Sequence, residues 1–394
     1  MKIRAFLQGI KQSFLGFHKE EALLCLTIAS TFTPFVIPAV MALICMVYLF
    51  VRRDLRNKMF VTRGFKSMLL LFSLVVLVPV VHGFFIGIGT GLLFIMLMFF
   101  VFFARIVMTK PVFETSVDLC LLLSVLCTLV GLIQLAINHD DPFSVQYRVP
   151  SVFFNANYYG SMMEMVIMCC IYKISTRPQY KILYIVIALF GVLGIYLSGS
   201  MSAFVALCGG ILTVMLIRHR RTGFNVFFAC MVFCAIAILM VPDLFPRIAE
   251  LSKTLGLREE IWETTIKGIQ DSPWVGHGVL GYMDAYVKYQ SFETTHAHNI
   301  YLNLILDFGV IGGALFLYYI YRMIEPIFPA IKYHYDRDLC TLVIAQIAVV
   351  LIHGVTDVTY LWIQTGVLLM TILCVPGILT PEESEPVQPE SGAQ

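Results

Sequence analysis

Long apolar runs constrain this chain more than any other feature of its sequence. Twelve of them recur between residues 21 and 379, near residues 21–33, 35–51, 67–84, 86–107, 115–137, 158–175, 180–198, 201–217, 224–241, 299–321, 338–354 and 358–379. Most approach the length that a helix needs to cross a bilayer. Only 13% of the residues are charged, about half the share in a soluble domain. The pattern therefore predicts one helical membrane bundle.

We expect an all-α polytopic membrane protein of about twelve transmembrane helices, with residues 1–379 as a single membrane-embedded domain. Pro34 and Pro38 interrupt the first two runs, which form either one bent helix or two short ones. The tail, residues 380–394, has four Glu and no basic residue, and it is predicted to be a disordered cytoplasmic end.

The positive charges predict the orientation. All but six of the 27 Lys and Arg residues fall on the side of the N-terminus under a twelve-span arrangement. By the positive-inside rule both termini are cytoplasmic. The opposite, extracytoplasmic side holds two polar segments, residues 138–157 and 242–298, and the remaining six basic residues, which are Arg148, Arg247, Lys253, Arg258, Lys267 and Lys288.

The net charge and the positions of the cysteines argue against nucleic-acid binding, a disulfide framework and a zinc site. The formal net charge is +2, which gives no basic surface for nucleic acid. All eleven cysteines lie inside apolar runs, where they behave as small hydrophobic residues, so neither a disulfide framework nor a zinc site is predicted.

The first outward segment offers Arg148, Asn155 and Asn157 just before an apolar run. An arginine and two amides at a helix start could bind an anion. The alternative is an interfacial loop in which the asparagines turn the chain and the tyrosines belong to an aromatic belt.

The second outward segment ends on His296-Ala297-His298-Asn299, where the chain re-enters the membrane. A histidine there could accept a proton from a hydroxyl; equally, both imidazoles could cap the next helix. A metal is not expected, because no nearby group of carboxylates or cysteines completes a coordination sphere. Upstream, residues 257–270 are predicted to be a helix with Trp262, Ile266 and Ile269 on one face.

Five further ionisable residues lie in or at the ends of apolar runs, where an ionisable group is costly and is a functional candidate by default. They are His82, Glu164, Asp307, His353 and Asp357. Gly309, Gly312 and Gly313 are expected only to permit close helix packing.

At these residues the sequence resembles the O-antigen ligase and O-antigen polymerase superfamily. The resemblance lies in the order and spacing of one stretch: Arg258-x-x-x-Trp262, Ile269-x-Asp271-x-Pro273-x-x-Gly276-x-Gly278, His296-x-His298-Asn299-x-Tyr301-Leu302 and Gly309-x-x-Gly312. A looser similarity covers residues 148–160.

The resemblance implies a GT-C-like fold in a bacterial inner membrane and a metal-independent glycosyltransferase without a cofactor. The donor is a glycan on undecaprenyl diphosphate; the acceptor is a lipid A core sugar for a ligase and a lipid-linked repeat unit for a polymerase. His298 is then the general base or the group that orients the acceptor, His296 is its support, and Arg258 and Arg148 bind the diphosphate. Residues for sugar binding or orientation are Trp262, Asn299, Tyr301, Asn155 and Asn157. The alternatives are that Trp262 and Tyr301 anchor their helices at the membrane interface and that Asn299 caps the next helix.

One departure from the family pattern is Ser200-Met201, where a Ser-Arg pair is common; Arg148 is our hypothesis for the missing arginine. Two other functions compete with the enzyme. A transporter or flippase of lipid-linked glycans would place polar groups near the midplane, whereas this chain concentrates its charge in outward loops. A non-catalytic assembly partner is the third alternative.

Overall fold

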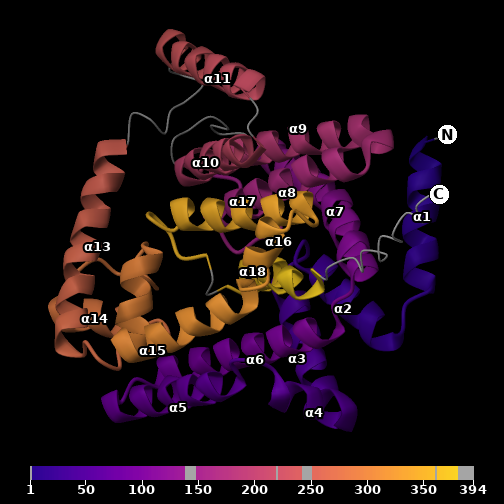
Figure 1. Cartoon of the computed structure of the whole chain (residues 1–394). Helices are drawn as coiled ribbons and strands as arrows, with labels where there is room; N and C mark the ends of the chain where they lie inside the picture. The colour runs from indigo at the N-terminus through magenta and orange to yellow at the C-terminus, as the bar shows by residue number, and fades with distance from the viewer. Residues whose placement is uncertain (1, 138–147, 219–220, 242–250, 360–361, 380–394) are drawn as a thin grey trace, which may run out of the picture.

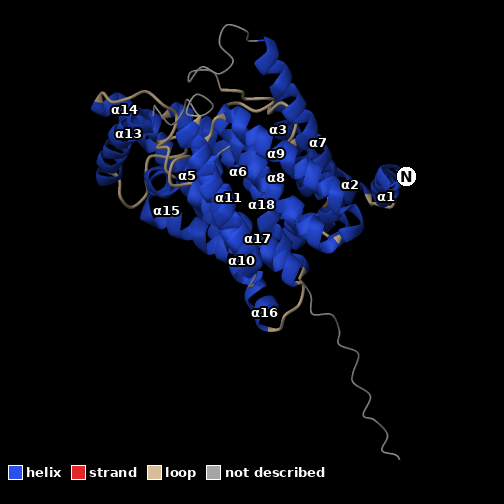
Figure 2. Cartoon of the chain, turned by 90° about the horizontal axis from the view of Figure 1, so that it is seen from above, coloured by secondary structure: helices blue, strands red, loops and turns tan. Residues whose placement is uncertain are grey.

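The structure is a computed structural model that describes residues 2–137, 148–218, 221–241, 251–359 and 362–379. Within these ranges every regular element is helical (Figure 2). The helices are α1 (Lys2–Leu15), α2 (Lys19–Ser30), α3 (Val36–Val51), α4 (Arg53–Val61), α5 (Phe65–His82), α6 (Phe85–Val107), α7 (Lys110–Ile137), α8 (Ala156–Thr176), η1 (Pro178–Tyr180), α9 (Lys181–Ser198), α10 (Met201–Arg218), α11 (Arg221–Met240), α13 (Leu251–Asp271), α14 (Tyr282–Tyr289), α15 (Ile300–Ile324), α16 (Ile327–Lys332), α17 (Arg337–His353), α18 (Ile363–Cys374) and η3 (Val375–Ile378). The predicted tail and residues 138–147 of the first outward segment lie outside the described residues.

The all-α prediction is confirmed over this part of the chain. Each predicted apolar run overlaps one helix, in order α2, α3, α5 to α11, α15, α17 and α18. Among the described residues, six segments are long and apolar enough to cross a membrane, and the pair α3 and α4, bent by 94°, would make a seventh. The twelve crossings and the GT-C-like topology remain predictions.

Helix α8 shows how a membrane helix can carry charge. It lies in the centre of the bundle and packs against α9, α10 and α17 (Figure 1). Glu164 and Lys173 on this helix are both fully buried. Both side chains are surrounded by protein, because an ion exposed to lipid is costly, and their ionisable partners lie on other helices.

The first two apolar runs form two separate helices. Between α2 and α3 the hydroxyls of Ser30, Thr31 and Thr33 donate to backbone carbonyls three residues earlier. These bonds satisfy carbonyls that the end of α2 leaves without helical partners. The two helices then pack against each other.

Helices α13 and α14 lie together at one edge of the molecule, and α1 lies at the opposite edge (Figure 1). Helix α13 begins six residues before the predicted start at Leu257 and ends at Asp271, one residue after the predicted end at residue 270. Its buried face carries Ile261, Thr265 and the small Gly268, and it packs on α15. Ile266, one of the three residues predicted to share a face of this helix, is 45% exposed.

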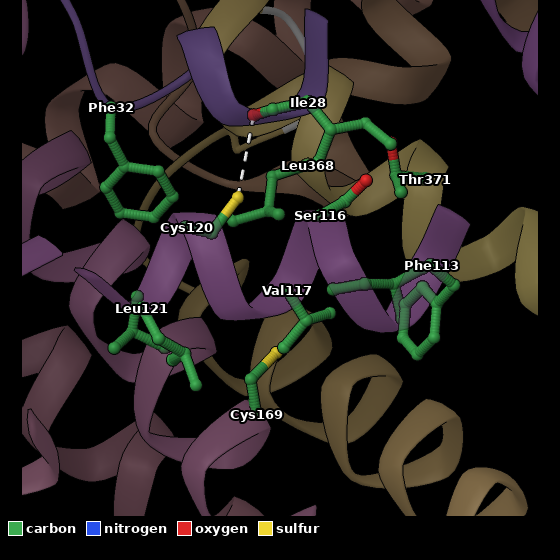
Figure 3. Close-up of a pocket in the computed structure, with 12 residues that line it drawn as sticks. Ile28, Phe32, Phe113, Ser116, Val117, Cys120, Leu121, Cys169, Leu368 and Thr371 are labelled. Atoms are coloured by element: carbon green, nitrogen blue, oxygen red, sulfur yellow. Dashed lines mark hydrogen bonds between the residues drawn. The ribbon is translucent and has the colours of Figure 1, made fainter. Parts of the chain in front are cut away.

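A narrow pocket lies among α2, α7, α8 and α18 (Figure 3). Apolar side chains such as Phe32 and Leu368 line most of it, and the Cys120 thiol donates to the Ile28 carbonyl at 3.6 Å. None of the predicted site residues is among its lining residues. This pocket is therefore a packing feature of the bundle.

Candidate active site

Helix α15 is broken at Gly309, which has φ +64° and ψ −177°. The break leaves backbone groups of α15 without helical partners, and the loop between α13 and α14 forms hydrogen bonds with them. His277 N donates to Leu306 O at 2.9 Å and Val310 N donates to Pro273 O at 2.9 Å. A Cβ on Gly309 would lie 2.3 Å from the backbone carbon of Trp274. Gly309 was expected only to permit helix packing, and the structure corrects this: only glycine readily adopts this conformation at such a close approach.

A polar chain runs from this break to the histidines. Asp307 Oδ1 accepts from Gly281 N at 3.0 Å, and its Oδ2 accepts from Asn303 Nδ2 at 2.7 Å. Asn303 Oδ1 accepts in turn from the backbone N–H of Ala297 at 3.0 Å. Ala297 lies between His296 and His298, so α15 holds the His-x-His turn by its backbone.

The histidines meet a carboxylate that is distant in sequence. His296 Nε2 lies 2.9 Å from Asp357 Oδ1, and His298 Nδ1 lies 3.4 Å from the same oxygen. His296 and Asp357 are buried, whereas 23% of the His298 side chain is exposed. His298 has φ +46°, a left-handed backbone conformation. The cluster thus has a buried His–Asp pair and a more exposed second imidazole.

Burial and hydrogen bonding give the two members of the buried pair, His296 and Asp357, different charge states. Burial lowers the pKa of His296. Burial alone would raise the pKa of Asp357, but its interactions with His296 and His298 hold that pKa well below the usual range. At neutral pH the carboxylate is therefore ionised and His296 is neutral. Its Nε2 then donates to Asp357, while Nδ1 accepts from the Thr295 hydroxyl at 2.8 Å.

Arg258 lies beside this cluster. It begins the third turn of α13, and its guanidinium donates to the carbonyl of Thr356, the residue before Asp357. The Thr356 hydroxyl also lies 2.5 Å from the hydroxyl of Ser202, at the start of α10. Thr356 therefore connects Arg258 to the helix start at which Met201 departs from the family pattern.

Arg148 belongs to a second group. Its Nε donates to Ser198 O at 2.9 Å and its Nη2 donates to Asn157 Oδ1 at 2.5 Å. Asn155 caps α8 by accepting from Tyr158 N at 3.0 Å. The first outward segment thus joins Arg148 to Asn157 and to the end of α9, whereas Asn155 caps α8.

Aromatic rings connect the two groups. The Tyr158 ring lies 5.1 Å from the Trp362 ring, and the Trp362 ring lies 6.0 Å from the His296 ring. Phe154 stacks on Trp362 at 5.6 Å and is 62% exposed. Trp362 therefore contacts the ring of Tyr158, the residue after Asn157, and the ring of His296.

The other predicted residues have structural contacts. Asn299 Oδ1 caps α15 by accepting from the backbone of Tyr301 and Leu302, while its amide donates to Val355 O at 3.1 Å. The Tyr301 hydroxyl donates to Leu351 O at 2.9 Å. Trp262 packs against a small cluster around Ile261. The capping alternative thus holds for Asn299.

A second His–carboxylate pair is buried deeper in the bundle. His353 Nδ1 lies 2.9 Å from Glu164 Oε1, and both side chains are almost fully buried. His353 is the last residue of α17, one helical turn before Asp357, whose backbone N–H donates to His353 O at 3.2 Å. This pair connects α8 to the turn that carries Asp357.

Sequence reasoning missed the role of Asp357, although it flagged the residue as an ionisable group at a span end. The expectation of no metal rested on the lack of a nearby carboxylate, and the structure corrects that premise. One ligand atom each from His296, His298 and Asp357 lies within 4.8 Å of the others. Among the described residues these three could hold a cation.

Residues 183–317 match the family model described as O-antigen ligase. The matched segment is roughly a third of the chain and contains Arg258, His296 and His298, whereas Arg148 and Asp357 lie outside it. The match supports the resemblance to the O-antigen ligase superfamily. No curated protein matches the chain.

Proposed function

We propose that this chain, a member of the O-antigen ligase superfamily by its match over residues 183–317, is a membrane glycosyltransferase that uses a polyprenyl-diphosphate-linked glycan as donor. The glycan passes from undecaprenyl diphosphate to a sugar hydroxyl on the extracytoplasmic face. The observation that carries the proposal is the convergence of His298, His296, Asp357 and Arg258, from three separate parts of the chain, on one turn.

The reaction divides among these residues as follows. The acceptor hydroxyl attacks the anomeric carbon, its proton moves to Nε2 of His298, and the bond to the diphosphate oxygen breaks. The Thr294 hydroxyl lies 3.3 Å from this Nε2, which supports an approach of a hydroxyl from that side. Asp357 faces Nδ1 at 3.4 Å and stabilises the imidazolium that forms.

The leaving group is a diphosphate anion, and Arg258 is the residue that we assign to it. A guanidinium binds phosphate oxygens in a bidentate manner and keeps its charge at every physiological pH. Arg148 is assigned as a second diphosphate contact. Trp262, Asn299, Tyr301, Asn155 and Asn157 keep their structural contacts and shape the sugar site around them. No step uses a metal ion.

The test is glycan transfer by the purified protein in lipid, with EDTA present and an undecaprenyl-diphosphate oligosaccharide as donor. We expect product from the parent and a loss of roughly 100-fold or more in His298→Ala. His334→Asn is the matched control, because His334 is exposed and has φ +62°, a conformation that asparagine tolerates.

The product identifies the acceptor class. We favour the ligase, whose product carries a lipid A core anchor; a ladder of repeat units on undecaprenyl diphosphate would instead identify a polymerase. Full activity of His298→Ala would remove His298 from the mechanism. If the parent makes no product with either acceptor but moves lipid-linked glycan between leaflets, the transferase is wrong and the protein is a flippase.

A further inference from the structure

The cluster of His296, His298 and Asp357 also has the composition of a metal site. Two imidazoles and one carboxylate form the ligand set of many zinc sites that leave a fourth position open. The three ligand atoms lie within 4.8 Å of one another. Such a set arises here from segments 61 residues apart that fold onto one point.

Two atoms of the cluster are buried without a hydrogen-bond partner among the described residues. They are Nδ1 of His298 and Oδ2 of Asp357. Buried polar atoms of native proteins nearly always have a partner, and exceptions often mark a site for an ion or a ligand. A cation bound between the imidazoles and the carboxylate would give Nδ1 of His298 a partner.

The distances suit a small cation. Ligand atoms about 2.0–2.1 Å from a tetrahedral zinc lie roughly 3.4 Å apart, and His298 Nδ1 lies 3.4 Å from Asp357 Oδ1. His296 Nε2 lies closer to that oxygen, at 2.9 Å, so these two atoms would have to move apart by about half an ångström to bind the ion. Thr295 holds the other nitrogen of His296 at 2.8 Å, the kind of support that orients metal-bound imidazoles.

We propose that His296, His298 and Asp357 bind a transition-metal dication such as Zn²⁺, and that the bound ion switches the transferase off. A neutral imidazole that binds the ion through Nδ1 carries its proton on Nε2. Nε2 of His298 then cannot accept the proton of the acceptor hydroxyl. The metal binding needs no assumption about activity, whereas the inhibition rests on the proposed function.

The electrostatics add a second, independent expectation. The positive charge of Arg258 acts on His296, and it opposes a dication at short range. Arg258→Gln removes that charge and should tighten metal binding by several-fold. An Mg²⁺ ion prefers an oxygen-rich octahedron, so it should not compete for this nitrogen-rich site.

The experiment uses the purified full chain in lipid nanodiscs, freed of metal by a chelator that is then removed. Co²⁺ is the spectroscopic probe, and Zn²⁺ and Mg²⁺ are the competitors. We expect one equivalent of Co²⁺ with tetrahedral visible absorption, displaced by Zn²⁺ and not by Mg²⁺. His298→Asn should weaken binding at least tenfold, because asparagine tolerates φ +46° but lacks the imidazole; His334→Asn should bind like the parent.

No Co²⁺ band, or equal affinity in His298→Asn and the parent, would overturn the site. A Zn²⁺ ion that binds there and leaves glycan transfer unchanged or faster would overturn the switch. A band that depends on His298 in a protein with no transfer under any condition would support the site and reject the transferase, so the two failures are distinguishable.

Discussion

Two buried polar clusters lie at opposite ends of α8, and they differ in how completely their groups are paired. At the C-terminal end, Lys173 Nζ lies 2.6 Å from Glu114 Oε2 and 2.9 Å from Asp118 Oδ1. Arg177 bonds Asp118 at 2.8 Å, and the hydroxyl of Tyr184 donates to the same carboxylate at 3.0 Å.

At the N-terminal end the pairing is incomplete. Among the described residues, Nδ1 of His298, Oδ2 of Asp357 and Nε2 of His353 are buried without a hydrogen-bond partner. The C-terminal cluster has two acids and two bases within reach of each other, which is the arrangement expected of a structural lock. The difference teaches that burial alone does not identify a functional ionisable side chain. Buried polar atoms without a hydrogen-bond partner are the better indication of one.

The largest effect in this comparison is expected for Asp357→Asn. The amide keeps the shape of the side chain but removes the charge that holds the imidazoles and stabilises an imidazolium. We expect transfer to fall by roughly 10²–10⁴-fold, with the thermal unfolding midpoint close to that of the parent. A near-parental kcat in this variant would exclude the carboxylate from the mechanism. The N-terminal cluster would then be structural, like the C-terminal one.

Lys173→Met tests the other end of α8. It leaves two carboxylates with one cation in a buried site, and breaking such a network costs about 3–5 kcal/mol. The variant should unfold at a clearly lower temperature in detergent, while the molecules that remain folded keep normal transfer per mole. Lys181→Met is the control, since Lys181 is exposed. Unchanged stability of Lys173→Met would contradict the structural lock.

Arg258→Lys sharpens the assignment of the site. Lysine keeps the charge but not the planar fork that binds phosphate oxygens. A charged hydrogen bond contributes about 1.5–3 kcal/mol, so we expect a loss of roughly 10–100-fold in kcat/KM with normal expression. Steady-state kinetics with varied donor will show it. A lysine variant as fast as the parent would mean that Arg258 only holds Thr356.

The smallest effect concerns the break that supports the site. Gly309→Ala places a Cβ 2.3 Å from the Trp274 backbone in a region of φ and ψ that costs about 1–3 kcal/mol for other residues. Thermal stability should fall by that amount. Gly256→Ala is the control, because its Cβ would meet no atom within 4 Å and alanine favours a helix. Equal stability of the two variants would contradict the role of Gly309.

The helices were within reach of sequence reasoning, because each apolar run is local and overlaps one helix. The motif of Arg258, His296 and His298 could also be recognised in the sequence, because its residues lie within one continuous part of the chain. The apolar pattern placed Trp262, Ile266 and Ile269 on one face of α13 but did not show which face packs; packing on α15 buries the Ile261 face and leaves Ile266 exposed. Gly309 was misjudged because a glycine that permits packing and a glycine that breaks a helix look alike in a sequence.

By itself, the sequence of this protein determined the apolar helices and the local order of the site motif, because periodic burial and turn chemistry act over a few residues. Only the tertiary structure decided which distant charges meet. Asp357 reaches His296 across 61 residues, and Lys173 reaches Glu114 across 59. Both residues are ionisable groups in apolar parts of the sequence. The residues within a few positions of either one do not show whether all of its polar atoms find hydrogen-bond partners in the folded bundle.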